Sequence, residues 1–384
     1  MKVQTNKSFL TILVPILFSF YVMGFVDIVN IATSYVKQDF FLNDKLANLL
    51  PMTVFLWFAI FSLPTGILMG KIGRKKTVLL SALITTVAML IPLLGYNFPM
   101  MLITFALLGI GNTVLQVSLN PLLASVASKD KVTSMLTLGQ SIKAIASLLG
   151  PVLVGLAVGL NNWKLIFPVY AGLTLLSLIW LAWTPINEEI EEKTGNSLGD
   201  IFALLKDKYI LALFMLVVLI VGIEIGIMTT VPKYLLERCN LPLEKGILGC
   251  SLYYVARMIG TFIGAILLVK ISSKKFFIIS MAIAVASMIC FMLFENSLLI
   301  MGSLFVLGLA CSNAIAIVFS KALGCNTSRS NDISALMIMG VAGGALLPPV
   351  MGAVADVSNQ LVSLTVPLIG LIFLLLSSIF IVKN

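Results

Sequence analysis

The chain contains no histidine and few charged residues of either sign. Of its 384 residues, only 11% are Asp, Glu, Lys or Arg, and 60% are hydrophobic. A soluble protein cannot bury that much apolar surface, so the composition predicts that lipid surrounds much of the chain. Because histidine is absent and carboxylates are few, we expect no zinc or other metal, no cofactor and no catalytic nucleophile–base pair, and therefore no enzyme.

Two further features exclude other classes of protein. The five cysteines have no CxxC spacing that would indicate a metal or redox motif. The net charge of +9 does not predict nucleic-acid binding, because the basic residues cluster in short loops between apolar segments. Seventeen lysines and arginines fall in the segments assigned to the cytoplasm and six in the outside loops, which predicts that both termini are cytoplasmic.

A sequence repeat gives the domain plan. Residues 66–81 (GILMGKIGRKKTVLLS) recur 199 positions later as residues 265–280 (AILLVKISSKKFFIIS), with seven identities in sixteen. Each copy lies where one long apolar stretch ends and another begins. The repeat predicts two tandem membrane bundles of the same topology, which is the plan of many secondary transporters.

Twelve apolar segments are long enough to span a bilayer. They cover about 9–36, 46–70, 76–95, 98–127, 133–159, 164–184, 206–236, 244–270, 274–294, 296–325, 330–355 and 360–382. The polar stretch between the sixth and seventh segments is predicted to be a linker. We therefore predict an all-α integral membrane protein with a six-helix bundle in residues 1–186, a cytoplasmic linker in 187–205 and a second bundle in 206–384.

Polar side chains lie on defined faces of these predicted helices. A charged or amide group at bilayer depth costs about 2.5–3.5 kcal/mol, so such a group usually faces a cavity or a partner. Converging amides and hydroxyls provide the directional donors and acceptors that a polyhydroxylated ligand needs. The predicted substrate-binding residues are Asn30, Gln116, Asn120, Gln140, Lys143 and Asn313.

Each of these residues also has a structural interpretation. The amide of Asn120 precedes Pro121 and would satisfy backbone groups that the proline frees. Gln116 would serve as a hydrogen-bonded clip between helices. Lys143 and Arg257 lie near the middle of their helices, where each would either contact an anion or pair with a buried acid.

Asp27 and Glu224 are the carboxylates well inside the predicted spans. If transport is coupled to protons, these two acids are the leading proton carriers. Protonation of such an acid releases a cationic partner, and this change can bias which side of the membrane the cavity opens to.

Several segments resemble a known family. GILMGKIGRKK resembles the signature of the loop between helices 2 and 3 in the major facilitator superfamily, with Gly70 in place of its acid. The segments LQVSLNPLLASV, LTLGQSIKAIASLLGP, VGIEIGI and SALMIMGVAGGALLPPVMGAVAD are similar to patterns of its fucose/glucose–galactose permease branch. The resemblance implies twelve helices in two bundles related by a pseudo-two-fold axis, alternating access, and a cavity lined by helices 1, 4, 7 and 10.

The chain departs from that branch at the positions that concern coupling. Gln116 stands where the branch has an acid on helix 4, and Lys143 replaces an asparagine. The helix 1 acid of the branch aligns nearer Asn30 than Asp27. Only Glu224 fits its motif without a change, so the coupling residues cannot simply be transferred.

Residues and resemblance together predict a proton-coupled symporter that takes up a neutral monosaccharide across the inner (plasma) membrane and works as a monomer. The alternative is a symporter of an anionic substrate such as a sugar acid, because Lys143 and Arg257 are two buried cations. Drug efflux fits the amide-rich faces less well, and a non-transporting sensor would need a domain that relays its signal.

Overall fold

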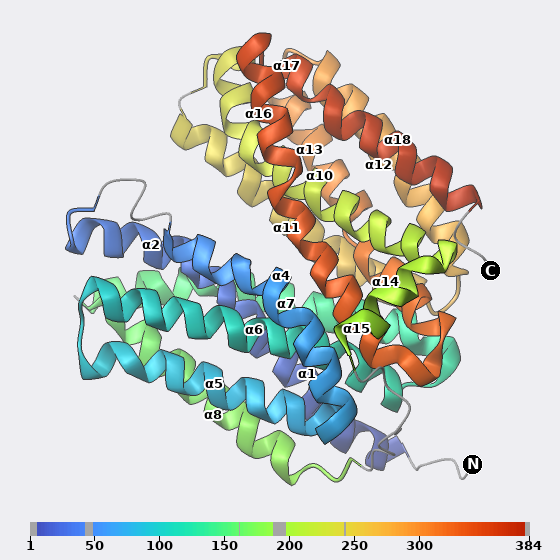
Figure 1. Cartoon of the computed structure of the whole chain (residues 1–384). Coiled ribbons are helices and arrows are strands. Elements are labelled where there is room, and N and C mark those ends of the chain that lie inside the picture. The colour runs from blue at the N-terminus through green and yellow to red at the C-terminus, as the bar shows by residue number, and fades with distance from the viewer. Residues whose placement is uncertain (1–5, 43–48, 161, 187–196, 242, 381–384) are drawn as a thin grey trace. The chain divides into compact units, whose positions relative to one another are not determined.

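The computed structural model describes residues 6–42, 49–160, 162–186, 197–241 and 243–380, and every regular element among them is a helix (Figure 1). Within these residues, eleven helices are long and apolar enough to cross a membrane, and Leu56–Ile72 forms a shorter apolar helix. The prediction of an all-α, multi-pass membrane fold is confirmed.

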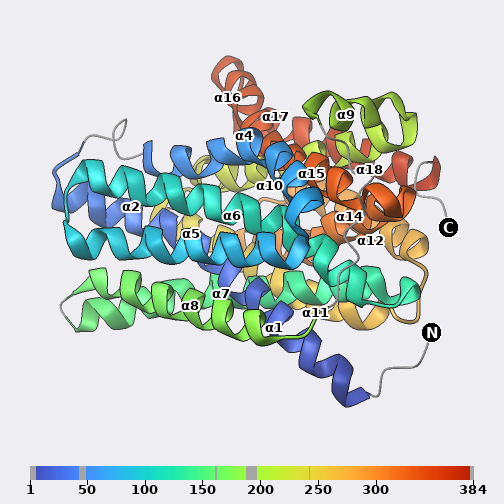
Figure 2. The same ribbon diagram turned by 60° about the horizontal axis from the view of Figure 1, so that its bottom comes forward.

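The helices of the first half follow the predicted segments to within a few residues. The first span consists of α1 (Asn6–Gly24), a 3₁₀ turn (Phe25–Asp27) and α2 (Ile28–Asp39). The next five spans are α4 (Leu49–Ile72), α5 (Arg74–Leu94), α6 (Phe98–Val126), α7 (Val132–Gly159) and α8 (Ile166–Trp183). Helix α5 packs against α6 and α8, as Figure 2 shows from a second direction.

The second half begins with the short helix α9 (Leu198–Ala203), whose first turn is closed by a capping box between Ser197 and Asp200. The helices that follow are α10 (Lys208–Cys239), α11 (Leu243–Leu267), α12 (Ser273–Leu293), α13 (Ser297–Cys311), α14 (Ala314–Cys325), α15 (Ser330–Met339), α16 (Leu347–Val357), α17 (Gln360–Ser363) and α18 (Thr365–Phe380).

The chain packs as two compact units that differ from the predicted halves. Unit 1 comprises Met1–Val132, Ile142–Leu204 and Asn326–Met339, and unit 2 comprises Thr133–Ser141, Leu205–Cys325 and Gly340–Asn384. Part of the predicted linker, residues 187–196, lies outside the described residues. The division into 1–186, 187–205 and 206–384 stays a prediction.

The sequence repeat is present in the boundaries of the helices. Both ends of α12 lie 199 positions after the ends of α5, and α13 begins 199 positions after α6. The asparagines before α6 and α13, Asn97 and Asn296, both cap the helix with a side chain that accepts a backbone hydrogen bond. The two copies therefore share local structure as well as sequence.

The same helix–helix contact also occurs in each copy. A Cβ on Gly109 of α6 would lie 2.7 Å from the backbone oxygen of Val54 on α4, and one on Gly308 of α13 would lie 2.7 Å from the backbone oxygen of Tyr253 on α11. Gly308 and Tyr253 lie 199 positions after Gly109 and Val54. Glycine at these two positions lets neighbouring helices approach closely in each unit.

Three predicted spans are interrupted rather than continuous. The first has a 3₁₀ turn at Phe25–Asp27, the tenth is broken at residues 312–313, and the eleventh has a 3₁₀ stretch at Gly340–Ala345. In the last of these, a Cβ on Gly343 would overlap the backbone of Val218, so close packing requires a glycine. Interruptions at membrane depth are tolerated where they are buried in protein or line a cavity.

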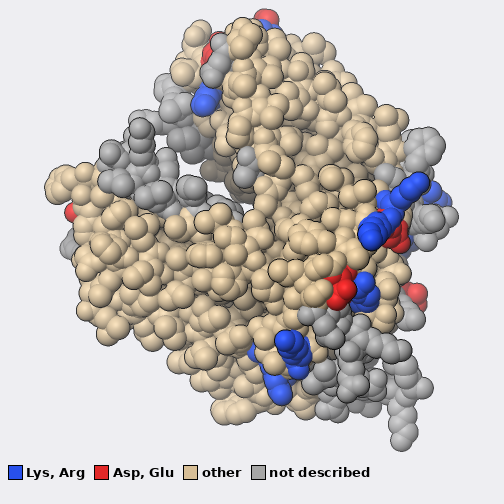
Figure 3. Space-filling model, viewed as in Figure 1, with Lys and Arg blue, Asp and Glu red and all other residues tan. Residues whose placement is uncertain are grey.

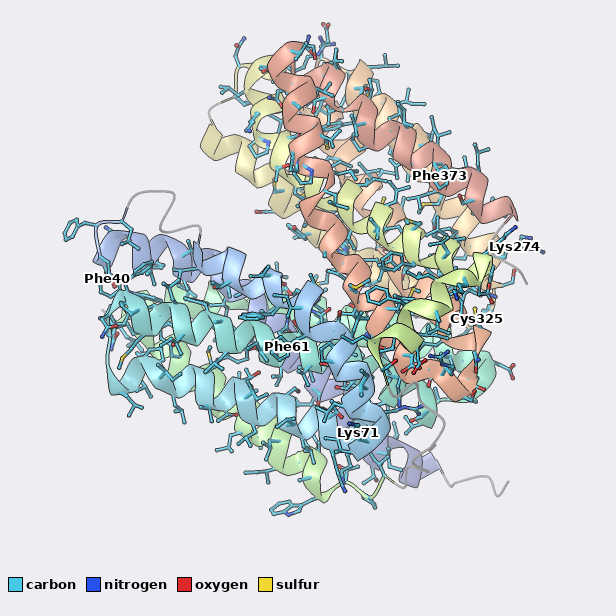
Figure 4. The ribbon with its side chains drawn as sticks, viewed as in Figure 1. Phe40, Phe61, Lys71, Lys274, Cys325 and Phe373 are labelled. Atoms are coloured by element: carbon cyan, nitrogen blue, oxygen red, sulfur yellow. The ribbon has the colours of Figure 1, made fainter. Side chains whose placement is uncertain are left out.

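Large apolar side chains are exposed on the surface of the helices. Leu94, Trp183 and Leu298 expose 84%, 83% and 80% of their surface. Most of the surface visible in Figure 3 carries no charged side chain. In unit 1, Phe40 after α2 and Lys71 in the last turn of α4 lie at opposite ends of the helices (Figure 4). Charged groups are thus sparse along the spans, as the composition requires.

Candidate substrate and coupling site

Asp27 lies at the interruption of the first span. It is the last residue of the 3₁₀ turn between α1 and α2, and its side chain is exposed. The hydroxyl of Ser147 on α7 donates a hydrogen bond to Asp27 Oδ2 at 2.5 Å. Helix α7 comes this close because Gly24 has no side chain, and a Cβ there would overlap the carbonyl oxygen of Lys143. Asp27 is therefore held by a hydroxyl from α7.

Two of the predicted amides lie one turn apart on α6. Gln116 is half-buried, whereas Asn120 is 5% exposed and donates from Nδ2 to the backbone oxygen of Gln116 at 2.9 Å. The carbonyl that Pro121 leaves without its helical donor is that of Val117, and it accepts a hydrogen bond from the hydroxyl of Ser334 at 2.6 Å. The amide of Asn120 is thus directed at its own helix, and Gln116 is the more accessible of the two.

The remaining predicted residues of the first half are placed less completely. Gln140 and Lys143 are both half-buried and lie one turn apart near the middle of α7. By their contacts Gln140 belongs to unit 2 and Lys143 to unit 1. The backbone of Asn30 is in α2, but its side chain lies outside the described residues.

Glu224 and Arg257 form an ion pair inside unit 2. Glu224 Oε1 on α10 contacts the guanidinium Nη1 of Arg257 on α11, and the two side chains are 11% and 26% exposed. Arg257 was predicted either to contact an anion or to pair with a buried acid, and in this structure it pairs with Glu224. An acid and its counterion lie together within membrane-spanning helices, which is an expensive arrangement that usually marks function.

Asn313 lies at the break in the tenth span. Its side chain is 1% exposed, and Nδ2 donates to the backbone oxygen of Gly260 at 2.8 Å and to Ser312 Oγ at 2.7 Å. A Cβ on Gly264 would overlap the Asn313 amide, so α11 has a glycine where this side chain enters. In this conformation Asn313 joins α11 to the broken helix, and its role as a substrate ligand stays a prediction.

A comparison with protein families decides the class of the protein. The model of the Major Facilitator Superfamily matches residues 14–320. The chain belongs to the Major Facilitator Superfamily. It is therefore a multi-pass membrane transporter and not an enzyme.

The chain is also similar to individual superfamily members. It is 23% identical to the glucose/galactose transporter of Brucella abortus over 384 residues, which cover 95% of this chain and 93% of that protein. It is 25% identical over 388 residues to a putative glucose/galactose transporter of Helicobacter pylori, with 93% of each chain covered.

Solved structures of the superfamily share the fold. The E. coli fucose:proton symporter FucP superposes with a TM-score of 0.86 at 16% identity, covering 98% of this chain and all of that chain. The proton:xylose symporter XylE superposes with a TM-score of 0.76 at 14% identity, covering 99% of this chain and 97% of that chain. At these identities the likeness shows the fold alone.

The superfamily's signature loop has a changed set of contacts in this chain. Gly70 replaces the signature acid. Arg74, the first residue of α5, donates from Nε to Asn331 Oδ1 and from Nη2 to Ser330 Oγ, each at 2.7 Å. All of these residues belong to unit 1. These two hydrogen bonds of the signature arginine therefore go to neutral side-chain oxygens.

Sequence reasoning missed two hydrogen-bonded acids, one of them buried. Asp332 in the first turn of α15 has a fully buried side chain and pairs with Arg329 at 2.8 Å. Asp39 at the end of α2 accepts hydrogen bonds from the hydroxyl of Tyr96 at 2.6 Å and from the indole of Trp163 at 3.0 Å. In the sequence both acids lie next to a helix end. An acid at such a position is ordinarily solvated, so the sequence did not indicate these contacts.

Proposed function

We propose that this protein is a proton-coupled symporter that takes up a neutral monosaccharide by alternating access. The two similar proteins described above are named glucose/galactose transporters, and the two structural neighbours are named symporters of a sugar and a proton. The amide-rich faces of α6 and α7 suit hydroxyl groups, since amides both donate and accept hydrogen bonds. The site needs no metal or cofactor.

The Glu224–Arg257 ion pair is the observation that carries the choice of a neutral substrate. The carboxylate already compensates the charge of Arg257, which leaves this guanidinium poorly suited to a substrate anion. Lys143 remains the one predicted residue that favours the alternative, an anionic substrate such as a sugar acid.

The proposed roles follow the geometry of each unit. Asn30, Gln116, Asn120, Gln140, Lys143 and Asn313 are the proposed substrate-binding residues, and Asp27 and Glu224 carry the coupling proton. Gln116 and Gln140 are the half-buried amides of this set, so we expect them to make the strongest contacts with sugar hydroxyls.

The cellular setting completes the proposal. The distribution of lysine and arginine supports an orientation with both termini in the cytoplasm. We place the transporter in the inner (plasma) membrane as a monomer, with a small sugar, a proton and the lipid bilayer as its partners and no nucleic acid.

Proton flux tests this function directly. Purified protein in proteoliposomes is given a panel of neutral hexoses and pentoses beside the corresponding uronic and aldonic acids, with a pH dye outside. Alkalinisation of the medium by a neutral sugar is the expected result. Alkalinisation by the acids alone would establish the anionic alternative. No alkalinisation by any member of the panel, with counterflow intact for one of them, would exclude proton coupling.

A further inference from the structure

One buried amide of unit 1 has no hydrogen bond. Asn112, in the middle of α6, is 2% exposed, and among the described residues neither its Nδ2 nor its Oδ1 has a partner. Buried polar groups are nearly always paired, because an unpaired one costs free energy. In a transporter the first partner to consider for such a group is the transported molecule.

A second unpaired donor lies on the neighbouring helix α4. The indole Nε1 of Trp57 is buried and has no partner among the described residues, although the ring itself is only half-buried. A Cβ on Gly109 of α6 would lie 2.9 Å from Trp57 Cδ1, the ring carbon bonded to this nitrogen. The indole therefore packs against α6 at Gly109, one turn before Asn112.

Trp57 and Asn112 lie at the same height of unit 1. Helices α4 and α6 are in contact at Val54 and Gly109, and they run in the same direction because a single span, α5, separates them along the chain. Trp57 is three residues beyond Val54 on α4. Asn112 is likewise three residues beyond Gly109 on α6, so each lies about 4.5 Å past the contact along its helix. Gln116, which is half-buried, follows one turn later on the same face of α6.

The second copy of the repeat keeps this helix contact without these side chains. In unit 2 a Cβ on Gly308 would lie 3.0 Å from the Cβ of Ala256, which stands 199 positions after Trp57. The residue 199 positions after Asn112 is Cys311. The packing of the two helices therefore requires neither the indole nor the amide.

We propose that Trp57 and Asn112 form a sugar-ring site in unit 1, which binds a neutral hexose in its pyranose form through one face of the ring and one pair of adjacent hydroxyls. This inference rests on the proposed transport of a neutral sugar and adds two residues to its site. The C–H groups of one pyranose face stack on the indole, whose π face is electronegative. The Asn112 amide donates from Nδ2 to one hydroxyl and accepts at Oδ1 from the neighbouring hydroxyl.

The chemistry of the amide explains why the ligand is neutral. An amide presents a donor and an acceptor side by side, and two adjacent hydroxyls satisfy both, since each hydroxyl donates and accepts. The carboxylate of a sugar acid only accepts, so it would leave Oδ1 unpaired beside a negative charge. Because Asn112 is closed off in this conformation, the sugar reaches it in another state of the alternating-access cycle.

Sugar binding to the purified protein in detergent tests the site. The natural protein and Asn112→Cys, which introduces the residue of unit 2, are titrated by calorimetry with D-glucose, D-galactose and their monodeoxy derivatives. In the natural protein, loss of either of two adjacent hydroxyls should weaken binding about tenfold, because it leaves the buried amide unmatched. Asn112→Cys should bind the parent sugar about tenfold more weakly and should distinguish it less than threefold from the same two derivatives. If this variant keeps the natural preference among the derivatives, the proposal is wrong.

Trp57→Ala separates stacking on the ring from recognition of the hydroxyls. This variant, which also introduces the residue of unit 2, should bind every sugar of the panel about tenfold more weakly and keep the natural preference among the derivatives. Trp180→Ala is the matched control, because Trp180 is a tryptophan of unit 1 on α8 whose ring contacts Phe18. Its sugar binding should equal that of the natural protein. A loss of affinity in Trp180→Ala as large as that in Trp57→Ala would refute the role of stacking.

Stability in the absence of sugar distinguishes a ligand-binding role of Asn112 from a structural one. The rate at which folded protein is lost in detergent should be equal or lower for Asn112→Cys, because this variant removes an unpaired buried group. A faster loss together with natural sugar affinity would mean that the amide supports the packing of the helices, and would overturn the proposal.

The site and the transport function fail in different ways. If the natural protein binds no sugar of the panel, the proposed transport of a neutral sugar fails and the site fails with it. If the natural protein binds and transports a sugar while Asn112→Cys and Trp57→Ala match it in affinity and preference, the transport function stands and this site alone is excluded.

Discussion

Gly308 offers a quantitative test of the close contact between α11 and α13. In Gly308→Ala, the new Cβ would lie 2.7 Å from the backbone oxygen of Tyr253, whereas ordinary contact begins at 3.4 Å. The helices would have to separate by about 0.7 Å, and a gap of this size forfeits a quarter to a half of each contact's attraction. Overpacking of this kind typically costs about 1–3 kcal/mol.

An opposing effect reduces this cost. Replacing a helical glycine by alanine in an open position favours the helix by about 0.8–1.0 kcal/mol. We therefore expect a net loss of about 0–2 kcal/mol for Gly308→Ala, and a loss at the middle of this range, about 1 kcal/mol, corresponds to a factor of about 5 in the ratio of folded to unfolded protein. Gly302→Ala is the matched control on the same helix, because no heavy atom lies within 4 Å of its added Cβ, and it is expected to be stabilising.

The assay is the rate at which folded protein is lost in detergent at one fixed temperature, since membrane proteins often unfold irreversibly. Gly308→Ala should decay several-fold faster than the natural protein and Gly302→Ala more slowly. Equal decay rates for the two variants would mean that the α11–α13 contact adjusts freely, and would refute the close-packing argument.

Three more predictions concern the candidate site and its surroundings. Gln116→Ala should raise the KM for the transported sugar about tenfold with little change in stability, because the amide is half-buried. Asn120→Ala should change KM less than threefold, because its amide donates a hydrogen bond to its own helix. Uptake kinetics of both variants test this difference. Lys143→Ala should still transport neutral sugars and should show no preference for sugar acids. If transport of a sugar acid is the only activity that this variant loses, the anionic alternative is established. Asp39→Asn should destabilise the protein by about 0.5–1.5 kcal/mol, because it removes the charge from an exposed acceptor of hydrogen bonds from Tyr96 and Trp163, without changing the proton dependence of uptake. Burial, followed by the hydrogen bond to Asp39, raises the pKa of Tyr96, so the hydroxyl stays a donor and this effect should persist in alkaline buffers; thermal unfolding at pH 6 and 9 checks it.

Much of the fold was predictable because its signals are local. Span length depends on bilayer thickness and apolar composition, so α5, predicted over about 76–95, is observed at Arg74–Leu94. The interruptions at Phe25–Asp27 and at residues 312–313 were not predicted. An apolar segment with a short break has the same hydropathy as a continuous one, and the break depends on a partner helix, here the backbone oxygen of Gly260 that receives Asn313.

The candidate site was predicted only in part, because pairing depends on distance across helices. Sequence position indicated that Arg257 lies deep in the membrane, where it would either contact an anion or pair with a buried acid. It could not choose between Asp27 and Glu224, since both acids lie near the middle of a first helix of their repeat. The side chain of Asn120 shows the other limit, because an amide on a polar stripe can still bond to its own backbone.

The recurring glycine contact also bears on how the two halves diverged. If the chain arose by duplication of a six-helix ancestor, its halves began identical, and every difference between positions 199 apart was acquired later. Val54 and Phe58 on one side, and Tyr253 and Arg257 on the other, are such differences within a conserved helix pairing. The Glu224–Arg257 ion pair is then a feature that only one of the two copies of this helix pairing acquired.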